Sequence, residues 1–324
     1  MKALICNEFG NINNLKFGEI NIPDVGPNQI LIKVKASSAN YADIVMINGQ
    51  YQTKPDVPFA PGLECAGIVE SVGSKISKFK PGDKVLAKLK YGGFAEYAIA
   101  NEDSSFVIPN KMSWEEAAAF FVAYVSSYVA IKWQGSLKSN ETILILGASG
   151  GTGITAIEIS KNMGANVIAA ASTKDKLSLC KKYGANQIIN YKDENLKEKI
   201  YELTSGKGVN VVFDPVGGSL FDPSLSSLGW GGRYIIFGFV AGIPKIPANR
   251  LLVKHRTAVG SSLRYYEMFE PEKIISSVNE LFEMFNQGKI KPLVSKVYTL
   301  EKSAEALNDL KNRKSTGRVI IKVN

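Results

Sequence analysis

Four of the seven residues from Gly147 to Gly153 are glycines, and they directly follow the apolar run Thr142–Leu146. A second apolar stretch with helical character begins near Ile154. Glycines let the backbone approach a phosphate, and the free amides and positive dipole at a helix start attract an anion. Glycine turns alone are common, but the preceding strand and the following helix make this context specific. The pattern predicts that a dinucleotide pyrophosphate binds at Gly150, Gly151, Thr152 and Gly153.

The segment after the next predicted strand indicates which dinucleotide is bound. Proteins that prefer NAD usually place Asp or Glu there to hold the ribose 2′-hydroxyl. Here the segment Ser172–Lys176 offers two hydroxyls and two ammonium groups, and its only acid, Asp175, suits the first turn of a helix. Charged hydrogen bonds contribute about 1.5 to 3 kcal/mol each, so two would favour NADPH roughly a hundredfold. The alternative, that these lysines only form a solvated face, stays open.

The residues available for metal binding are few. A catalytic zinc site needs three protein ligands, usually Cys, His or carboxylates. His255 is the only histidine, and Cys6, Cys65 and Cys180 show no C-x-x-C spacing. We expect no zinc, a structural role for His255 and inert core thiols.

A tyrosine acid paired with a lysine four residues later is another way to reduce a carbonyl, and Tyr128 and Lys132 have this spacing. In enzymes that use such a pair it follows the glycine loop, whereas here it precedes it, so Tyr128 is predicted to be a core residue. With no metal and no clear proton donor, hydride transfer favours acceptors that are already electrophilic, such as quinones and α,β-unsaturated carbonyls. The cofactor then carries the difficult chemistry, and the protein binds and orients.

The chain has two parts with different sequence patterns, and these predict the elements that position the residues above. Up to about residue 115, short alternating runs such as Gln29–Lys35 are separated by turn signals, which predicts a folded β-sheet or partly open β-barrel. From residue 117 strands alternate with helices, which predicts a parallel sheet covered on both faces. The tail from residue 265 is too short for a third domain. We predict an α/β protein with a catalytic domain of residues 1–116 and 265–324 and a nucleotide-binding domain of residues 117–264.

The predicted strands of the second part are Thr142–Gly147, Asn166–Ala171, Gln187–Tyr191, Val209–Asp214 and Arg233–Gly238, and the helices between them are Ile154–Met163, Lys174–Tyr183 and Asn195–Leu203. In the tail we predict helices Ile274–Gln287 and Ser303–Asn312 and strands Val294–Tyr298 and Gly317–Val323.

Composition limits the classes of partner. The 324 residues are 45% hydrophobic and 21% charged, as in a two-domain globular protein. The net charge of +9 is scattered, with no cluster of four basic residues, so nucleic-acid binding is not expected. The apolar run Ala117–Ile131 is shorter than the roughly 20 residues that cross a bilayer, and we expect a buried helix. An early acid, Glu8, argues against a secretory signal, and the odd cysteine count suits a reducing, cytoplasmic location.

Several motifs together resemble the medium-chain dehydrogenase/reductase superfamily and, within it, the zinc-free quinone oxidoreductases related to zeta-crystallin. The likeness covers nearly the whole chain. The matching segments are Asn40–Asp43, Gly49–Tyr51, Pro61–Gly67, Gly82–Val85, Gly93–Tyr97, Ala148–Gly153 and Asp214–Gly218.

The chain departs from the zinc-containing members at their metal ligands. Asn40 stands where those members have a cysteine shortly before the aspartate, and Leu63 stands in place of the histidine in Gly-His-Glu. The lobe that holds their structural zinc is missing as well. The resemblance therefore also implies an enzyme without zinc.

The resemblance implies a GroES-like catalytic domain and a Rossmann domain, with the active site in the cleft between them. Asn40 and Tyr41 would face the nicotinamide, with Ser126 nearby. The adenosine 2′-phosphate would lie among Ser172, Lys176 and Tyr191, with Arg313 reaching it from the tail. The nicotinamide half would contact two loops through the main chain of Asp214, Val216, Gly238, Phe239 and Val240.

Members of this family commonly form homodimers through the edge of the Rossmann sheet, which implies an interface within Arg233–Arg264. The leading hypothesis is an NADPH:quinone reductase. A reductase of enoyl thioesters or 2-alkenals is the alternative, with Lys54, Lys88 and Lys90 as cations at its entrance. A non-catalytic NADPH-binding protein is a third hypothesis.

Overall fold

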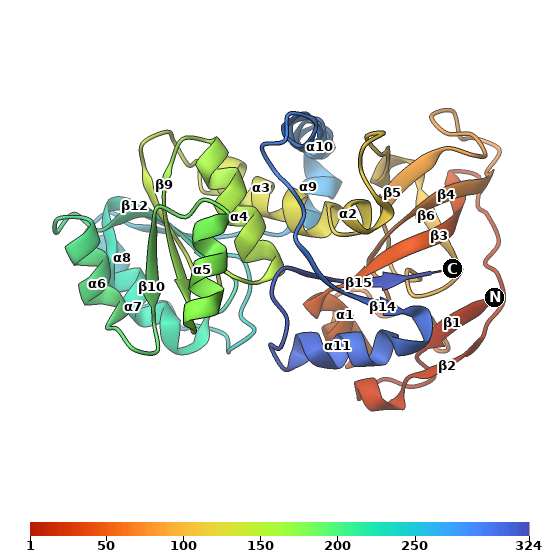
Figure 1. The fold of residues 1–324 in the computed structure, drawn as a ribbon, viewed down its shortest axis with the longest axis horizontal. Helices are drawn as coiled ribbons and strands as arrows, with labels where there is room; N and C mark the ends of the chain where they lie inside the picture. Colours follow the sequence, from red (N-terminus) through yellow and green to blue (C-terminus); the bar gives the residue numbers. More distant parts are fainter. Residues whose placement is uncertain (324) are drawn as a thin grey trace. The chain divides into compact units, whose positions relative to one another are not determined.

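A computed structural model describes residues 1–323 as two compact units. The first unit consists of residues 1–122 and 292–323, and the second of residues 123–291. Figure 1 shows the first unit in red to yellow and dark blue, because both ends of the chain contribute to it.

The first unit is built on a seven-stranded sheet with the order β14-β15-β3-β4-β5-β7, in which β6 also pairs with β3. All these pairs are antiparallel except β14 with β15. β1 and β2 form a separate antiparallel pair. The strands are β1 (Lys2–Ile5), β2 (Lys16–Glu19), β3 (Gln29–Ala39), β4 (Glu64–Val72), β5 (Lys84–Lys88), β6 (Tyr97–Asn101), β7 (Ser105–Val107), β14 (Val294–Thr299) and β15 (Arg318–Lys322). The predicted β-rich domain is confirmed.

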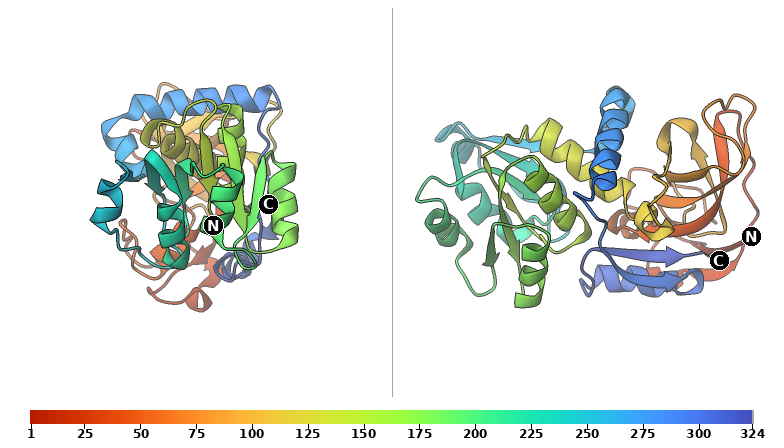
Figure 2. Two further views of the ribbon diagram at one scale, coloured as in Figure 1. Left: turned by 90° about the vertical axis from the view of Figure 1, so that its left-hand side faces the viewer. Right: turned by 45° about the horizontal axis from the view of Figure 1, so that its top comes forward.

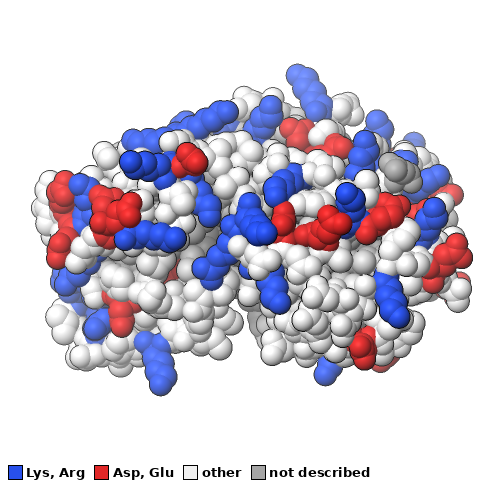
Figure 3. Space-filling model, turned by 60° about the horizontal axis from the view of Figure 1, so that its bottom comes forward, with Lys and Arg blue, Asp and Glu red and all other residues white. Residues whose placement is uncertain are grey.

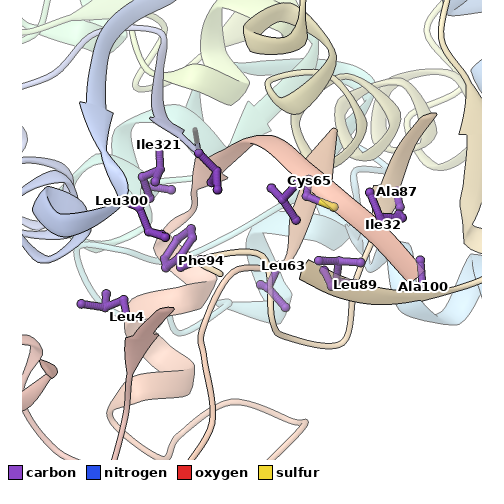
Figure 4. Packing of buried hydrophobic residues seen from close by; sticks show 14 of the residues in the cluster. Leu4, Ile32, Leu63, Cys65, Ala87, Leu89, Phe94, Ala100, Leu300 and Ile321 are labelled. Atoms are coloured by element: carbon purple, nitrogen blue, oxygen red, sulfur yellow. The ribbon is translucent and has the colours of Figure 1, made fainter. Parts of the chain in front are cut away.

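Alternation along β3 explains how this sheet forms its core. Ile30, Ile32 and Val34 are buried on one face of the strand, whereas on the other face Lys33 is exposed and Leu31 is buried. In the core, Leu4 and Phe94 lie together with Leu300 and Ile321 from the C-terminal segment (Figure 4). Burying each of these large side chains stabilises the fold by about 1.5 to 3 kcal/mol.

Short helices accompany this sheet. They are α1 (Tyr41–Ile47), α2 (Trp114–Ala118) and α11 (Ser303–Lys311), with 3-10 turns η1 (Ile12–Asn14), η2 (Glu102–Ser104) and η6 (Leu300–Lys302). The capping box of α2 follows from its sequence, because Ser113 accepts from the Glu116 amide and Glu116 accepts from the Ser113 amide.

The second unit contains a six-stranded, entirely parallel sheet with the order β10-β9-β8-β11-β12-β13. Its strands are β8 (Thr142–Ile145), β9 (Asn166–Ala171), β10 (Gln187–Asn190), β11 (Val209–Asp214), β12 (Leu228–Ile236) and β13 (Thr257–Gly260). They read as apolar runs because both faces of a parallel sheet are covered. β13 was not predicted.

Helices cover the two faces of this sheet (Figures 1 and 2). From β8 the chain adds β9 and then β10 on one side, and later adds β11, β12 and β13 on the other side. Because crossovers between parallel strands are right-handed, the helices of the first two crossovers, α4 (Gly151–Asn162) and α5 (Lys174–Lys182), lie on one face. The other face carries α6 (Leu196–Leu203), α7 (Phe221–Ser226) and α8 (Ala248–Leu252), with η5 (Gly218–Leu220) before α7. The predicted doubly wound Rossmann fold is confirmed.

The apolar run from Ala117 is helical but not regular. After α2 the chain winds as π-helix over η3 (Phe121–Val125), passes through α3 (Ser126–Tyr128) and winds as π-helix again over η4 (Val129–Gln134). The sequence periodicity carries no sign of these wider turns.

The units divide at 122/123 and 291/292 rather than at the predicted 116/117 and 264/265. The reason is that α10 (Pro271–Asn286), which follows α9 (Leu263–Phe269), packs on the η4 segment. Glu280 accepts hydrogen bonds from the Tyr128 hydroxyl at 2.5 Å and from Lys132 at 2.6 Å. These contacts hold the amphipathic helix in the second unit. The Tyr128 side chain is buried, as expected of a core residue.

The helices and the surface charges are relevant to two possible partners, a membrane and a nucleic acid. Among residues 1–323 no helix is long and apolar enough to span a bilayer. On the face shown in Figure 3, Lys and Arg side chains are interspersed with Asp and Glu. One face does not decide the matter, and the expectation that nucleic acid is not a partner stays a prediction.

Candidate active site

The glycine-rich loop connects β8 to α4. Gly147 has a φ of +57°, which favours glycine, and a Cβ at Gly153 would lie 2.5 Å from the Gly147 carbonyl oxygen. Gly150 is the N-cap of α4, and no side chain caps the helix. The first-turn amides therefore stand at a partly exposed helix start with the positive end of its dipole, as an anion site requires.

The predicted 2′-phosphate residues of this unit follow the neighbouring strands. Ser172 comes directly after β9, and Tyr191 comes directly after β10, where its amide donates to the Ala171 carbonyl at 3.2 Å. Thr173 caps α5 by accepting from the Lys176 amide, and Asp175 lies in the first turn of that helix. Ser172, Lys176 and Tyr191 are partly exposed at one end of the sheet, and their binding role stays a prediction.

Two further loops leave β11 and β12. They are hydrogen bonded to each other, because the Phe237 and Gly238 amides donate to the Asp214 carbonyl at 2.9 and 3.1 Å, and the Ala241 amide donates to the Val216 carbonyl at 2.8 Å. Gly238 is partly exposed, and Phe239 and Val240 are exposed.

Asp214 is buried, and its carboxylate serves its own loop. One oxygen accepts from the amides of Val216 and Gly217 at 2.7 and 2.9 Å, and the other accepts from the Tyr234 hydroxyl at 2.7 Å. Burial raises the pKa of Asp214, and these hydrogen bonds oppose the shift. The carboxylate and the main-chain carbonyl of Asp214 are thus both engaged within the protein, and its predicted contact with the cofactor stays a prediction. Tyr234 was missed because nothing in an apolar strand marks a phenol as a carboxylate partner.

Strand order places all these loops along one edge. The loops follow β10, β9, β8, β11 and β12, which are consecutive neighbours in a parallel sheet, so their carboxyl ends form a row. Ligands of open α/β sheets bind at this edge. The predicted cofactor residues of the second unit therefore all lie along the carboxyl edge of this sheet, and their contact with a cofactor stays a prediction.

In the first unit, Asn40 is buried and its side chain is already engaged. The Nδ2 group donates to the Ser38 carbonyl at 3.1 Å and to Glu64 Oε1 at 3.0 Å, and Oδ1 accepts from Arg318 Nη2 at 2.9 Å. Both amide hydrogens are therefore used, which limits the predicted cofactor contact to a remaining lone pair on Oδ1. Tyr41, the first residue of α1, is 41% exposed.

The partner of Asn40 is a buried ion pair between Glu64 and Arg318. Their side chains are only 1% and 8% exposed. Glu64 Oε2 accepts from the Val122 amide at 2.8 Å, and Arg318 Nη2 also donates to the Ser38 hydroxyl at 2.6 Å. Burial raises the pKa of Glu64, while Arg318 opposes the shift. Sequence reasoning missed Arg318. The one signal for it was Glu64 within the apolar motif Pro61–Gly67, because a buried carboxylate requires a cation as partner.

Asp43 lies beside this network. It is fully buried, and its Oδ2 accepts from the Asn40 amide at 2.7 Å. Burial raises the pKa of Asp43 to about 7, the charge of Glu64 adds to the shift, and the Asn40 amide and Arg318 reduce it.

The residues present do not fit a catalytic zinc ion. Within residues 1–323 no group of three His, Cys, Asp or Glu side chains is placed to hold a metal. At the two positions where zinc-containing relatives have ligands, Asn40 is hydrogen bonded to Glu64 and Arg318, and Leu63 has no donor atom.

Two other predicted residues lie apart from these networks. Ser126 is partly buried in α3 of the second unit. Arg313 is exposed, with a φ of +57°, in the turn between α11 and β15 of the first unit. Because Asn40, Tyr41 and Arg313 belong to one unit and Ser126 and the nucleotide loops to the other, their approach stays a prediction.

Comparison with known proteins adds to this geometry. Residues 26–110 match the alcohol dehydrogenase GroES-like domain, and residues 151–277 match the zinc-binding dehydrogenase family. A quinone oxidoreductase-like protein 2 homolog of Nematostella vectensis is 37% identical over 99% of this chain and 88% of its own length. The quinone oxidoreductase of Sus scrofa is 32% identical over 99% and 97% of the two chains. The structure of Escherichia coli quinone oxidoreductase complexed with NADPH superposes with a TM-score of 0.93, at 30% identity, over 99% and 100% of the chains.

These matches over nearly the full length, together with the two folds, define the class. The chain belongs to the medium-chain dehydrogenase/reductase superfamily, a family of oxidoreductases. Its relatives named above are quinone oxidoreductases and quinone oxidoreductase-like proteins. The predicted family is confirmed.

The Glu64–Arg318 pair generates the first testable prediction. Arg318→Met leaves Glu64 buried without its cation, and we expect the free energy of unfolding in urea to fall by about 3 to 5 kcal/mol. Combining Arg318→Met with Glu64→Gln removes both charges and should restore most of the loss. Arg313→Met, on the exposed turn nearby, is the control and should change stability by less than about 0.5 kcal/mol. A similar small effect of Arg318→Met would contradict a structural role for the pair.

Proposed function

We propose that this protein is an NADPH-dependent, metal-independent reductase of quinones and other conjugated carbonyls. The row of loops at the carboxyl edge of the parallel sheet supports the proposal most strongly. In this row the start of α4 has no side-chain cap, which suits a pyrophosphate, and the end of β9 is followed by Ser172 instead of an acid, which suits a 2′-phosphate. The names of the relatives and the donor set that does not suit zinc support the choice of acceptor.

In this proposal the loops divide the cofactor among them. The amides of Gly150–Gly153 hold the pyrophosphate. Ser172, Lys176 and Tyr191 receive the 2′-phosphate, with Arg313 joining from the other unit. The main chain of the loops at Val216 and Gly238–Val240 contacts the nicotinamide half, and Asp214 keeps these loops in place.

NADPH supplies a hydride when bound, and with one proton from solution it converts a quinone to the hydroquinone and leaves NADP⁺. The residues of this chain position the acceptor. Asn40 is held by Glu64 and Arg318 and fixes the start of α1, so Tyr41 is presented beside it as the wall of the acceptor pocket and a route for the proton. Ser126 is proposed to lie near the nicotinamide.

Turnover with a panel of acceptors tests the proposed function. NADPH and NADH oxidation would be followed by absorbance with benzoquinone, phenanthrenequinone, 2-hexenal and crotonyl-CoA, with and without a chelator. We expect quinone reduction that prefers NADPH and is unaffected by the chelator.

Each other outcome of that panel rejects the leading hypothesis in a different way. Preferred reduction of 2-hexenal or crotonyl-CoA would favour the alkenal or enoyl thioester reductase. Tight NADPH binding with no reduction of any acceptor would favour a non-catalytic binding protein. Loss of turnover on chelation would contradict metal independence.

The cofactor preference yields a separate prediction. Lys176→Ala removes a charged donor from the 2′-phosphate, so the KM for NADPH should rise by about tenfold, while the KM for NADH should change less than about twofold. Lys182→Ala, an exposed lysine at the end of the same helix, is the matched control. An equal effect of Lys176→Ala on both cofactors would contradict the assignment.

We also propose a homodimer formed through the outer edge of β13. Within residues 1–323 this edge has no strand partner, and exposed strand edges readily pair with a second chain. Large apolar side chains near the edge are exposed, with Trp230 at 78%, Leu252 at 78% and Val253 at 77%. Burial of such side chains against a second copy would stabilise the pair.

Light scattering after size exclusion tests the dimer. The wild type should have twice the chain mass, and Leu252→Asp with Val253→Asp should shift it toward the monomer. Ile22→Asp, an exposed apolar residue in the other unit, should leave the mass unchanged. A monomeric wild type would reject this interface.

The cysteines support a proposed cytoplasmic location. Cys6, Cys65 and Cys180 are free and buried, as suits a reducing compartment. Burial raises the pKa of the Cys180 thiol to about 12, so it stays protonated and unreactive. Cell fractionation checks this location.

A further inference from the structure

A cavity of about 300 Å³ in the second unit has a wall rich in cations. It lies between α6, the end of α7, α8 and the segment before β13. The residues that matter here are Lys197, Tyr201, Ser226, Arg250, Lys254 and Arg256, and we refer to this cavity as the basic pocket.

The basic pocket lies at the opposite end of the sheet from the candidate cofactor site. Ser226 precedes the first residue of β12, Leu228, and Arg256 precedes the first residue of β13, Thr257. The pocket is therefore at the amino ends of these parallel strands. The loops proposed to hold NADPH leave the carboxyl ends, so the two sites are distinct.

The positive charges of the pocket are mostly not neutralised. Arg250 pairs with Asp222 at 2.8 Å. Lys254 has only the neutral Tyr201 hydroxyl at 3.3 Å, with its ammonium group 5.6 Å from the centre of the same ring. Within residues 1–323, Lys197, Lys254 and Arg256 have no carboxylate within ion-pair distance.

The acids of the neighbouring helix are engaged elsewhere. Glu198 accepts from the Asn195 side chain at 2.9 Å, and Glu202 pairs with Lys199 at 2.8 Å. Lys197 and Tyr201 are four residues apart and share the helix face that lines the pocket. Helix α6 thus presents a cation and a phenol to the pocket and pairs these two acids with its own neighbours.

Arg256 adds a partly buried charge. Its Nη2 group donates to the carbonyls of Ser226 and Leu228 at 3.0 and 2.5 Å, and its Nε is buried without a hydrogen-bond partner in the described chain. Burial and the charge of Arg250 lower the pKa of Arg256. Carbonyl groups and the Tyr201 side chain therefore surround this guanidinium group, and no carboxylate in the described chain pairs with it. Its role in holding the end of α7 does not explain the lysines beside it.

We propose that the basic pocket binds a small anion with one or two phosphate groups, such as pyrophosphate or a phosphorylated metabolite. Phosphate oxygens accept charge-assisted hydrogen bonds from Arg and Lys, and the bound charge would offset the repulsion among these cations. The volume is at the lower end of the range for ligand pockets, which suits a small anion and not a dinucleotide.

Calorimetric titration of pyrophosphate tests the proposal. The protein is first saturated with NADPH, so that pyrophosphate cannot occupy the candidate cofactor loop, and the titration is repeated without NADPH. We expect one pyrophosphate per chain in the NADPH-saturated protein, and at least about tenfold weaker binding there to the Lys197→Ala/Lys254→Ala variant. Any second equivalent that binds only without NADPH is assigned to the candidate cofactor loop. Lys199→Ala, on the same helix but paired with Glu202, is the matched control and should bind as the wild type does.

Two single variants distinguish the basic pocket from the candidate cofactor site and from a loss of folding. Lys176→Ala should leave pyrophosphate binding unchanged, so failure of the proposed cofactor site would not be mistaken for failure of the pocket. The double variant could lower the melting temperature of the protein without ligand. In that case the single variant Lys197→Ala is used to measure pyrophosphate binding, because Lys197 is exposed and its replacement should not affect folding. No binding to the wild type, or equal weakening in Lys199→Ala and the pocket variants, would overturn the proposal.

Discussion

The buried ion pair between Glu64 and Arg318 is the interaction on which the first unit depends. The two residues are 254 positions apart, and each would be an uncompensated charge in the interior without the other. Their pairing requires β15 to lie beside β3, whose other neighbour is β4, so the C-terminal strand must join the N-terminal sheet. The same guanidinium group then orients Asn40 and Ser38. The candidate active-site loop is thus positioned by a residue near the other end of the chain.

A different constraint governs the second unit. A parallel sheet needs crossover helices, and these deliver successive loops to the same edge. The loops from β8, β11 and β12 meet there, and the carboxylate of Asp214 fixes one loop by binding its amides. The opposite edge collects different residues, including the cations of the basic pocket. One fold thereby provides two chemically distinct surfaces at the two ends of the same strands.

Contacts of helix α10 with the η4 segment decide where the units divide. Helix α10 is amphipathic, and its Glu280 side chain accepts from Tyr128 and Lys132. The tyrosine–lysine pair therefore has a structural partner within its own unit. This hydrogen bonding helps to place residues 265–291 in the unit with the parallel sheet, and the chain then returns to the first unit for β14 and β15.

The sequence by itself determined the features that lie within short windows. Strand and helix alternation predicted the Rossmann fold, and the glycines from Gly147 onward and the acid-free segment after β9 located the candidate cofactor loops, because such patterns reflect local backbone needs. Only the tertiary structure decided the partner of Glu64, the engagement of Asn40, the unit boundaries and the grouping of Lys197 with Lys254. These depend on which distant side chains packing brings together, and a buried charge or an apolar face specifies the kind of partner it needs but not its position in the chain.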